Sequence, residues 1–72
     1  MSSVHSERYR QFLGRLRRAR REARMTQADS ARALRRPQSF VSKCESGERR
    51  VDVVELEAFA KVYRKQLSFF LP

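Results

Sequence analysis

Apolar residues recur at intervals of three and four over the first third of the chain. The spacing places six of them on one face of a helix that runs from Ser6 to about Arg24, with Ser6 as its N-cap. These six residues are Tyr9, Phe12, Leu13, Leu16, Ala19 and Ala23. Glycine and proline occur only twice each, and no segment alternates β-branched and polar residues as a strand would. The pattern predicts a helical chain.

Two short helices follow in the middle of the chain. The first covers residues 26–34, where Thr26 and Asp29 have the spacing of a capping box. The second covers residues 37–46, because proline fits the first turn of a helix and Gly47 suits the left-handed position after its end. Only a tight turn separates the two helices.

A fourth helix and a short terminal element complete the pattern. Asp52 and Glu55 repeat the capping-box spacing. The helix that follows carries Val53, Leu56, Phe59, Ala60 and Tyr63 on one face. Residues 67–72 then form a short fifth helix or a tight turn. We expect one all-α domain of five helices over residues 1–72, with residues 1–5 frayed.

The positive charge is concentrated in the first half of the chain. Residues 8–36 contain eleven arginines but only two acids, Glu22 and Asp29, which accounts for the whole net charge of +9. A basic stripe of this kind is typical of a protein that meets phosphates. A solvated helix face or a helix on an anionic membrane surface would carry the same charge.

Composition excludes several other classes. Cys44 is the only cysteine, so it forms no disulfide within the chain, and no Cys/His cluster suggests a metal. No run of about 18 apolar residues could span a membrane, and the first residues lack the apolar stretch of a signal peptide. We therefore expect a cytoplasmic protein without cofactor or metal. A catalytic set of residues is also missing, which argues against an enzyme.

One arginine falls on the apolar face of the first helix. At about 100° per residue, Arg20 lies between Leu13 and Leu16. An unpaired buried charge is very costly, so the guanidinium needs a partner. Glu45 is the best candidate, because it lies four residues after Val41 on the core side of the third helix. The alternative is that Arg20 extends outward from the rim of the core.

The two middle helices have the spacing of a helix-turn-helix. The second of them presents a polar face opposite Val41 and Cys44, and such a face can enter the major groove. That face consists of Gln38, Ser39, Ser42 and Lys43. Glutamine can pair with adenine, lysine with guanine, and serine with several base edges.

Three motifs carry a resemblance to a known family. They are Thr26-Gln27-x-x-x-Ala31-x-x-Leu34, then Gln38-Ser39-x-Val41-Ser42-Lys43-x-Glu45-x-Gly47, then Leu56 with Phe59-Ala60-Lys61. At this spacing they resemble the Cro/repressor-type helix-turn-helix family, also called the XRE family, without a gap over about residues 16–71. The resemblance implies a five-helix, lambda-repressor-like domain that binds a pseudopalindromic operator as a homodimer, with residues 37–46 as the recognition helix.

The resemblance also implies roles for single residues. Arg20 and Glu45 match an ion pair between the first and third helices. The base-reading positions are Gln38, Ser39 and Lys43. The positions that contact the DNA backbone are Thr26, Gln27, Ser46, Arg49 and Arg50. Gln27 is further expected to brace the recognition helix.

Several positions depart from the family pattern. Ser30 stands where leucine is usual, which thins the expected packing of the second helix. Arg35, Arg36 and Pro37 replace the usual glycine, small apolar residue and Ser/Thr of the turn, so the pose of Gln38 stays open. Phe40 replaces a small polar residue. It could fill the space beside Ser30, touch a thymine methyl, or lie at a partner surface.

Four large apolar residues gather near the end of the chain. They are Leu67, Phe69, Phe70 and Leu71. Exposed apolar clusters usually mark an interface, so we expect these residues to form a homodimer contact.

The sequence thus predicts a sequence-specific transcriptional regulator that binds double-stranded DNA. The alternative is an antitoxin or anti-repressor that acts by binding a toxin or a related regulator, with or without DNA. An RNA-binding protein would explain the arginines but not the helix-turn-helix motifs.

Overall fold

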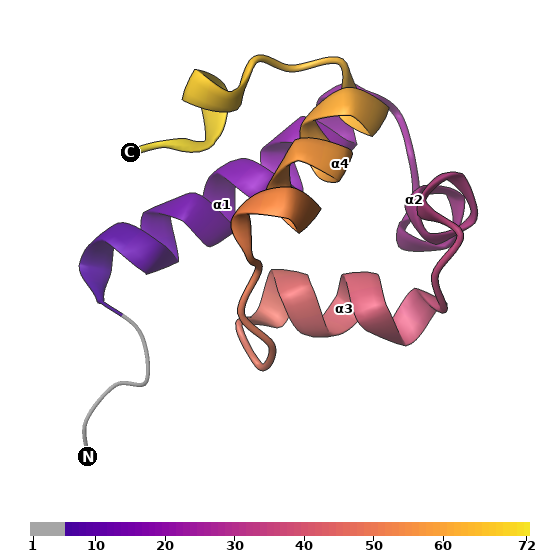
Figure 1. The fold of residues 1–72 in the computed structure, drawn as a ribbon, viewed down its shortest axis with the longest axis horizontal. Coiled ribbons are helices and arrows are strands. Elements are labelled where there is room, and N and C mark those ends of the chain that lie inside the picture. The colour runs from indigo at the N-terminus through magenta and orange to yellow at the C-terminus, as the bar shows by residue number, and fades with distance from the viewer. Residues whose placement is uncertain (1–5) are drawn as a thin grey trace.

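The computed structural model describes residues 6–72 and contains α-helices without strands in that range (Figure 1). The α-helices are α1 (Glu7–Glu22), α2 (Gln27–Leu34), α3 (Gln38–Ser46) and α4 (Val53–Tyr63), followed by the 3₁₀ turn η1 (Leu67–Phe70). The predicted all-α helix-turn-helix fold is confirmed, with four α-helices rather than five. The fifth element is one 3₁₀ turn, because only four residues lie between extended backbone at Gln66 and at Leu71. Residues 1–5, which we expected to be frayed, lie outside the described residues.

Side-chain caps fix the starts of three α-helices. The Tyr9 amide donates to Ser6 Oγ at 3.1 Å, so α1 begins where its periodicity predicted. Thr26 and Asp29 exchange both capping-box bonds at 3.0 and 2.9 Å. The capping box before α4, formed by Asp52 and Glu55, is complete as well. Each cap satisfies amides that no helical carbonyl can reach.

Arginines in the left-handed conformation end α1, α2 and α4. These are Arg24, Arg35 and Arg64, with φ of 59°, 58° and 58°. In each case the next amide closes onto the carbonyl five residues before it: Met25 onto Arg20 at 3.2 Å, Arg36 onto Ala31 at 2.9 Å, and Lys65 onto Ala60 at 2.9 Å. These are Schellman turns, in which glycine is the usual left-handed residue. Arg35 therefore adopts the left-handed conformation that glycine usually supplies at this position of the turn.

We expect Arg35→Gly to raise the free energy of unfolding by about 0.5–1 kcal/mol. Glycine removes the left-handed penalty of about 1–2 kcal/mol, and the added entropy of the unfolded chain offsets part of the gain. Urea unfolding followed by circular dichroism measures the change. Arg32→Gly is the matched control: the same exchange inside α2 should lower stability by about 1 kcal/mol. A lower urea midpoint for Arg35→Gly would contradict the expectation.

The core lies where the four α-helices and η1 meet. Its fully buried large side chains include Leu16, Phe59 and Phe70. Cys44 is also fully buried, and burial raises the pKa of its thiol. Cys44 is therefore a core residue with an unreactive thiol.

The two core departures from the family pattern are both accommodated inside the molecule. Ser30 is fully buried, and the Tyr63 hydroxyl donates to its Oγ at 2.9 Å. A polar pair therefore satisfies the position that the sequence predicted to be thinly packed. Phe40 is 8% exposed and lies parallel to Phe59, with ring centroids 6.0 Å apart. Its ring belongs to the core and not to a DNA or partner surface.

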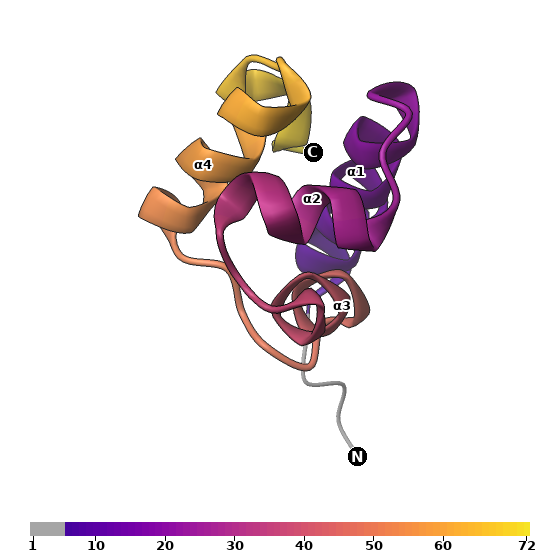
Figure 2. The same cartoon turned by 90° about the vertical axis from the view of Figure 1, so that its right-hand side faces the viewer.

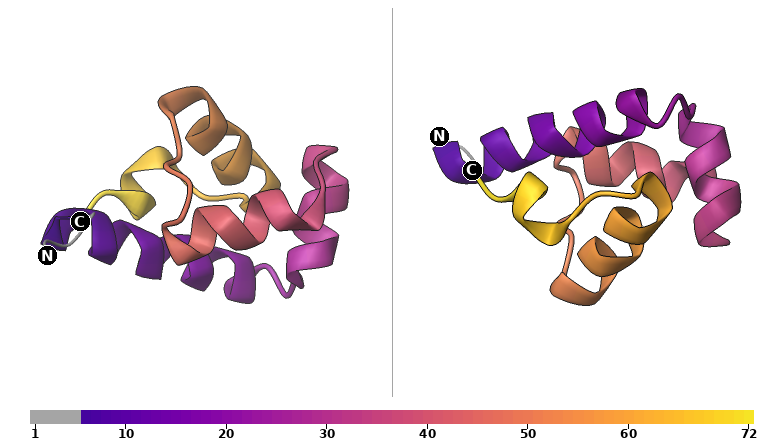
Figure 3. Two further views of the ribbon diagram at one scale, coloured as in Figure 1. Left: turned by 90° about the horizontal axis from the view of Figure 1, so that it is seen from below. Right: turned by 90° about the horizontal axis from the view of Figure 1, so that it is seen from above.

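The arrangement of α2 and α3 leaves one helix face open. In Figure 1 α3 runs across the view whereas α2 is seen nearly along its axis, and Figure 2 shows the reverse. The two helices therefore cross steeply. η1 lies at the end of the molecule opposite α3, and α1 and α4 lie on opposite sides of the molecule in Figure 2. Seen from below in Figure 3, the outer side of α3 is covered by no other helix.

Candidate nucleic-acid interface

The open face of α3 carries the residues that were predicted to read bases. Gln38, Ser39 and Lys43 are all exposed. None of the three has a side-chain hydrogen bond or ion pair within the part of the chain that the structure describes. Their donors and acceptors are therefore available to a ligand that docks against α3.

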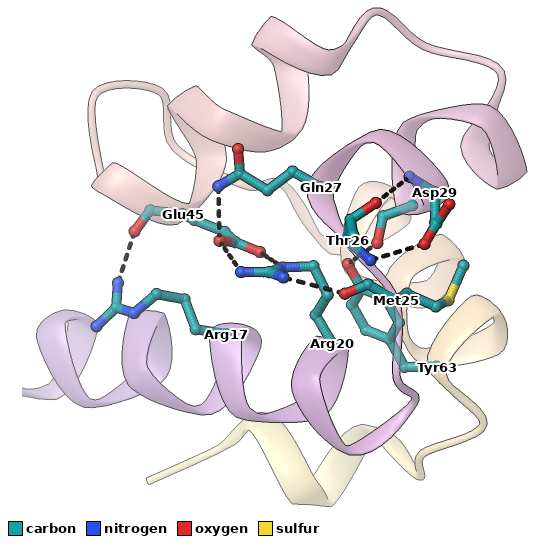
Figure 4. Close-up of polar contacts among 9 residues, drawn as sticks. Arg17, Arg20, Met25, Thr26, Gln27, Asp29, Glu45 and Tyr63 are labelled. Atoms are coloured by element: carbon teal, nitrogen blue, oxygen red, sulfur yellow. Dashed lines mark hydrogen bonds and ion pairs between the residues drawn. The ribbon is translucent and has the colours of Figure 1, made fainter.

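An ion pair fixes α3 against α1. The structure brings Arg20 and Glu45 together: Arg20 Nε lies 2.6 Å from Glu45 Oε2, and Nη2 lies 3.1 Å from Oε1 (Figure 4). The side chains are only 16% and 3% exposed, so water screens the pair weakly. Hydrogen bonding to Glu45 raises the pKa of Arg20 above its ordinary value. The third donor, Nη1, bonds the Met25 carbonyl at 3.0 Å.

Two further side chains reach the same end of α3. Gln27 Nε2 donates to Glu45 Oε1 at 3.0 Å, so the first residue of α2 braces the recognition helix (Figure 4). Arg17 Nη1 donates to the Glu45 carbonyl at 2.8 Å. The role of Arg17 was missed, because in the sequence it is one arginine of a basic run. The sequence feature that could have indicated this role is the position of Arg17 one turn before Arg20. If Arg20 packs against the third helix, Arg17 lies next to the negative C-terminal end of that helix.

The opposite edge of α3 is lined by a second pair of arginines. The Arg36 guanidinium lies 3.9 Å from the centre of the Phe40 ring, and that of Arg49 lies 4.9 Å from it. Arg49 also forms a bidentate ion pair with Glu55, at 2.7 and 2.8 Å. This pair lowers the pKa of the Glu55 carboxyl. Arg49, which was predicted to contact DNA, thus has a partner within the chain.

The other predicted backbone-contacting residues are Thr26, at the start of α2, and Ser46 and Arg50, at and after the C-terminal end of α3. Thr26 is beside Gln27, with its hydroxyl used as the cap of α2. Ser46 Oγ donates to the Lys43 carbonyl and accepts from the Glu48 amide, both at 3.2 Å. The Arg50 guanidinium lies 4.5 Å from the centre of the Tyr9 ring. The predicted residues therefore surround α3 on two sides.

Much of the basic stripe on α1 is used inside the molecule. Arg15 Nη1 donates to the carbonyls of Phe69 and Leu71, at 3.0 and 3.2 Å. Arg18 and Lys65 both pair with Glu22, at 2.8 and 2.6 Å, and hold its pKa down at about 2. These cations anchor the C-terminal segment. Among the described residues 8–36, four arginines have no side-chain partner: Arg8, Arg21, Arg24 and Arg35.

The predicted dimer contact at the C-terminus needs correction. Phe70 is fully buried, since η1 turns it into the core between α1 and α4. Phe69 is half-buried and meets the edge of Phe70, with Arg18 and Lys65 over its ring at 5.5 and 4.5 Å. Only Leu67 and Leu71, at 41% and 56%, keep substantial exposure. Phe70 is therefore a core residue of the single chain, and the contact of Leu67 and Leu71 with a second copy stays a prediction.

The described residues hold no cluster of three potential metal ligands. No helix of residues 6–72 has the length and apolar character needed to cross a membrane. Two short helices joined by a tight turn, with an uncovered polar face on the second, define a helix-turn-helix protein.

Comparison with known proteins agrees with this geometry. A family model described as a helix-turn-helix domain matches residues 11–66, well over half of the chain. The chain is similar to a solved structure named as an XRE-family like protein from Pseudomonas syringae pv. tomato str. DC3000. The identity is 42%, the TM-score is 0.85, and the match covers 93% of this chain and 82% of that one. Comparison of the sequence with curated proteins gives no match. The chain belongs to the XRE-type helix-turn-helix family, whose fold is that of DNA-binding regulators.

Proposed function

We propose that the protein is a sequence-specific transcriptional regulator that places α3 in the major groove of DNA. The observation that carries this proposal is the exposed face of α3, whose Gln38, Ser39 and Lys43 side chains have no partner within residues 6–72. The cluster around Glu45 holds this face rigidly, so little ordering entropy opposes binding. Direct contacts with base edges would then give sequence preference.

Phosphate contacts are proposed on both sides of α3. Thr26 and Gln27 lie at one edge, and Ser46, Arg49 and Arg50 lie at or after the end of the helix. The strands of DNA that border the major groove would pass along these two edges. Such contacts fix the register of α3 but carry no sequence information themselves.

We further propose that the protein binds a pseudopalindromic operator as a homodimer. The support is an apolar groove of about 380 Å³ beside the start of α4, lined by residues that include Tyr9, Phe12, Leu56 and Leu71. Val53 on its rim is 69% exposed, as is the neighbouring Val54 at 68%. A two-fold pair through this surface would present two copies of α3, which bind successive major grooves if they lie about 34–36 Å apart.

Lys43→Ala is expected to relax sequence preference. Loss of a base contact costs about 1–3 kcal/mol on the operator and changes binding to random DNA little. Titration of both duplexes with the wild type and the variant measures the difference. Lys61→Ala, an exposed lysine on α4, removes the same charge away from α3 and should affect the two duplexes equally. If Lys43→Ala weakens both duplexes to the same degree, Lys43 does not read a base.

The apolar groove also favours a second candidate function, binding of a toxin or of a related regulator. Exposed valines at the rim of an apolar groove suit a protein partner as well as a second copy. Sedimentation at micromolar concentration separates the two. A dimer supports the regulator that binds a palindrome, whereas a monomer leaves the groove open for another protein.

A further inference from the structure

Two departures from the family pattern form one structural feature. Arg36 lies just before Pro37, the N-cap of α3, and Phe40 lies in the first turn of that helix. The guanidinium rests 3.9 Å from the centre of the Phe40 ring. Phe40 is itself only 8% exposed and stacks in parallel on Phe59. Because Phe59 is fully buried, the surface on which Arg36 lies belongs to the rigid core.

The hydrogen-bonding groups of Arg36 are not used within the chain. Its guanidinium has no hydrogen bond or ion pair to another described residue, although the charge lies near enough to Glu55 to help lower the pKa of that carboxyl. A guanidinium stacked on a ring keeps its N–H donors in its own plane, free for an acceptor. Arg49, which lies over the same ring, differs because Glu55 occupies two of its donors.

The position of Phe40 on α3 places Arg36 at the edge of the polar face. At about 100° per residue, Phe40 lies about 60° from Lys43 and about 140° from Glu45 around the helix. The Phe40 edge and the Glu45 edge therefore flank the polar face on opposite sides. Gln27 and Arg17 lie at the Glu45 edge, and Arg36 lies at the other. A helix in the major groove meets a phosphate strand on each side.

We propose that Arg36 donates hydrogen bonds to a DNA phosphate at the start of α3, and that Phe40 is the positioning residue that holds it there. This inference rests on the proposed DNA-binding function. Stacking on a core ring removes rotamers that a free arginine would lose on binding. Phe40 thus contributes to DNA affinity without touching DNA.

The test is the salt dependence of binding to a random-sequence DNA duplex, measured by fluorescence anisotropy between about 50 and 200 mM salt. A phosphate contact is independent of sequence, so no operator is needed. Arg36→Ala should lower the slope of log K against log salt by about 0.9 for each bound copy and weaken binding several-fold. Arg64→Ala is the matched control, since Arg64 is the C-cap of α4, and Figure 1 shows that the C-terminal end of this helix points away from α3. It should leave the slope close to that of the wild type.

Phe40→Leu tests the positioning role, because it removes the ring but no charge. In samples shown by circular dichroism to be folded, it should also weaken binding and reduce the slope. When Arg36 is already alanine, adding Phe40→Leu should cause no further loss of slope. If Phe40→Leu lowers stability too far, Arg36→Ala against Arg64→Ala still decides the phosphate contact.

The outcomes separate this inference from the function on which it rests. Equal slopes for Arg36→Ala and Arg64→Ala would overturn the phosphate contact while DNA binding stands. A folded Phe40→Leu variant with the slope of the wild type would overturn the positioning role alone. Failure of the wild type to bind random DNA even at low salt would overturn the proposed function and this inference together.

Discussion

Replacing Glu45 by alanine is expected to remove a large part of the stability of the domain. Glu45 is 3% exposed and accepts hydrogen bonds from Arg20 and Gln27 (Figure 4). Its loss leaves a guanidinium that is only 16% exposed without a counter-charge. Removing one partner of such a pair costs about 3–5 kcal/mol. A 72-residue domain has a total of roughly 4–11 kcal/mol, so much of the variant would unfold.

Urea unfolding monitored by circular dichroism measures this loss, and two variants control it. Glu22→Ala removes a carboxylate that also pairs with two cations, Arg18 and Lys65, but at the surface. It should change the midpoint little, because water screens exposed pairs. Arg20→Met combined with Glu45→Leu replaces the buried pair by apolar packing and should recover most of the stability. If Glu45→Ala unfolds at a urea midpoint as high as that of Glu22→Ala, the pair of Arg20 and Glu45 does not stabilise the fold.

Phe70→Ala is expected to lower the free energy of unfolding by about 3–5 kcal/mol. The ring is fully buried, packs edge-on against Phe69 and closes the core beside α1. Deleting it leaves a cavity that the short η1 turn cannot fill, since Arg15 ties the carbonyls of Phe69 and Leu71 in place. The midpoint temperature of thermal unfolding should therefore fall at every protein concentration.

Leu71→Ala is the matched control for this prediction. Leu71 is 56% exposed on the wall of the apolar groove, so its loss should leave the stability of the monomer unchanged and, if the groove pairs with a second copy, weaken dimerisation. The earlier expectation for the C-terminus gives the contrary result. If Phe70→Ala changes only self-association and not thermal unfolding, Phe70 is an interface residue and the core assignment is wrong.

The sequence predicted the parts of the fold that depend on local chemistry. The starts of α1, α2 and α4 follow from Ser6, Thr26 and Asp52, whose side chains reach amides only three residues away. The meeting of Arg20 with Glu45 was predictable too, because a charge on an apolar helix face has few places to find a partner. For the caps, one turn of helix contains the whole physical cause, whereas for Arg20 the cause is the cost of burying its charge.

Most other contacts between distant segments were beyond the sequence. Arg15 and Arg17 look alike in the basic run, yet they reach Phe69 and Glu45 respectively. Those acceptors lie 54 and 28 positions away, and only the fold selects among them. The environments of the C-terminal apolar residues could not be predicted for a related reason. Four apolar side chains within five positions have no periodicity that distinguishes core from surface.

Phe40 shows the same limit at the recognition helix. Its position on the helical wheel is at the boundary between the core and the polar face, so the sequence left three environments open. In the structure the Phe40 ring stacks on Phe59 and lies beneath the Arg36 guanidinium. Two residues that differ from the family pattern in the sequence thus become one pair in space.

The proposal that α3 reads DNA sequence is tested most directly by selecting binding sites from random duplex DNA with the intact protein. A two-fold symmetric consensus is expected, with half-sites about 10–10.5 base pairs apart, as two copies of α3 on one face of DNA require. Lys43→Ala should lose the preference at one position of each half-site. Enrichment of no sequence, although the protein is folded and the DNA is bound, would contradict the role of α3 as a recognition helix.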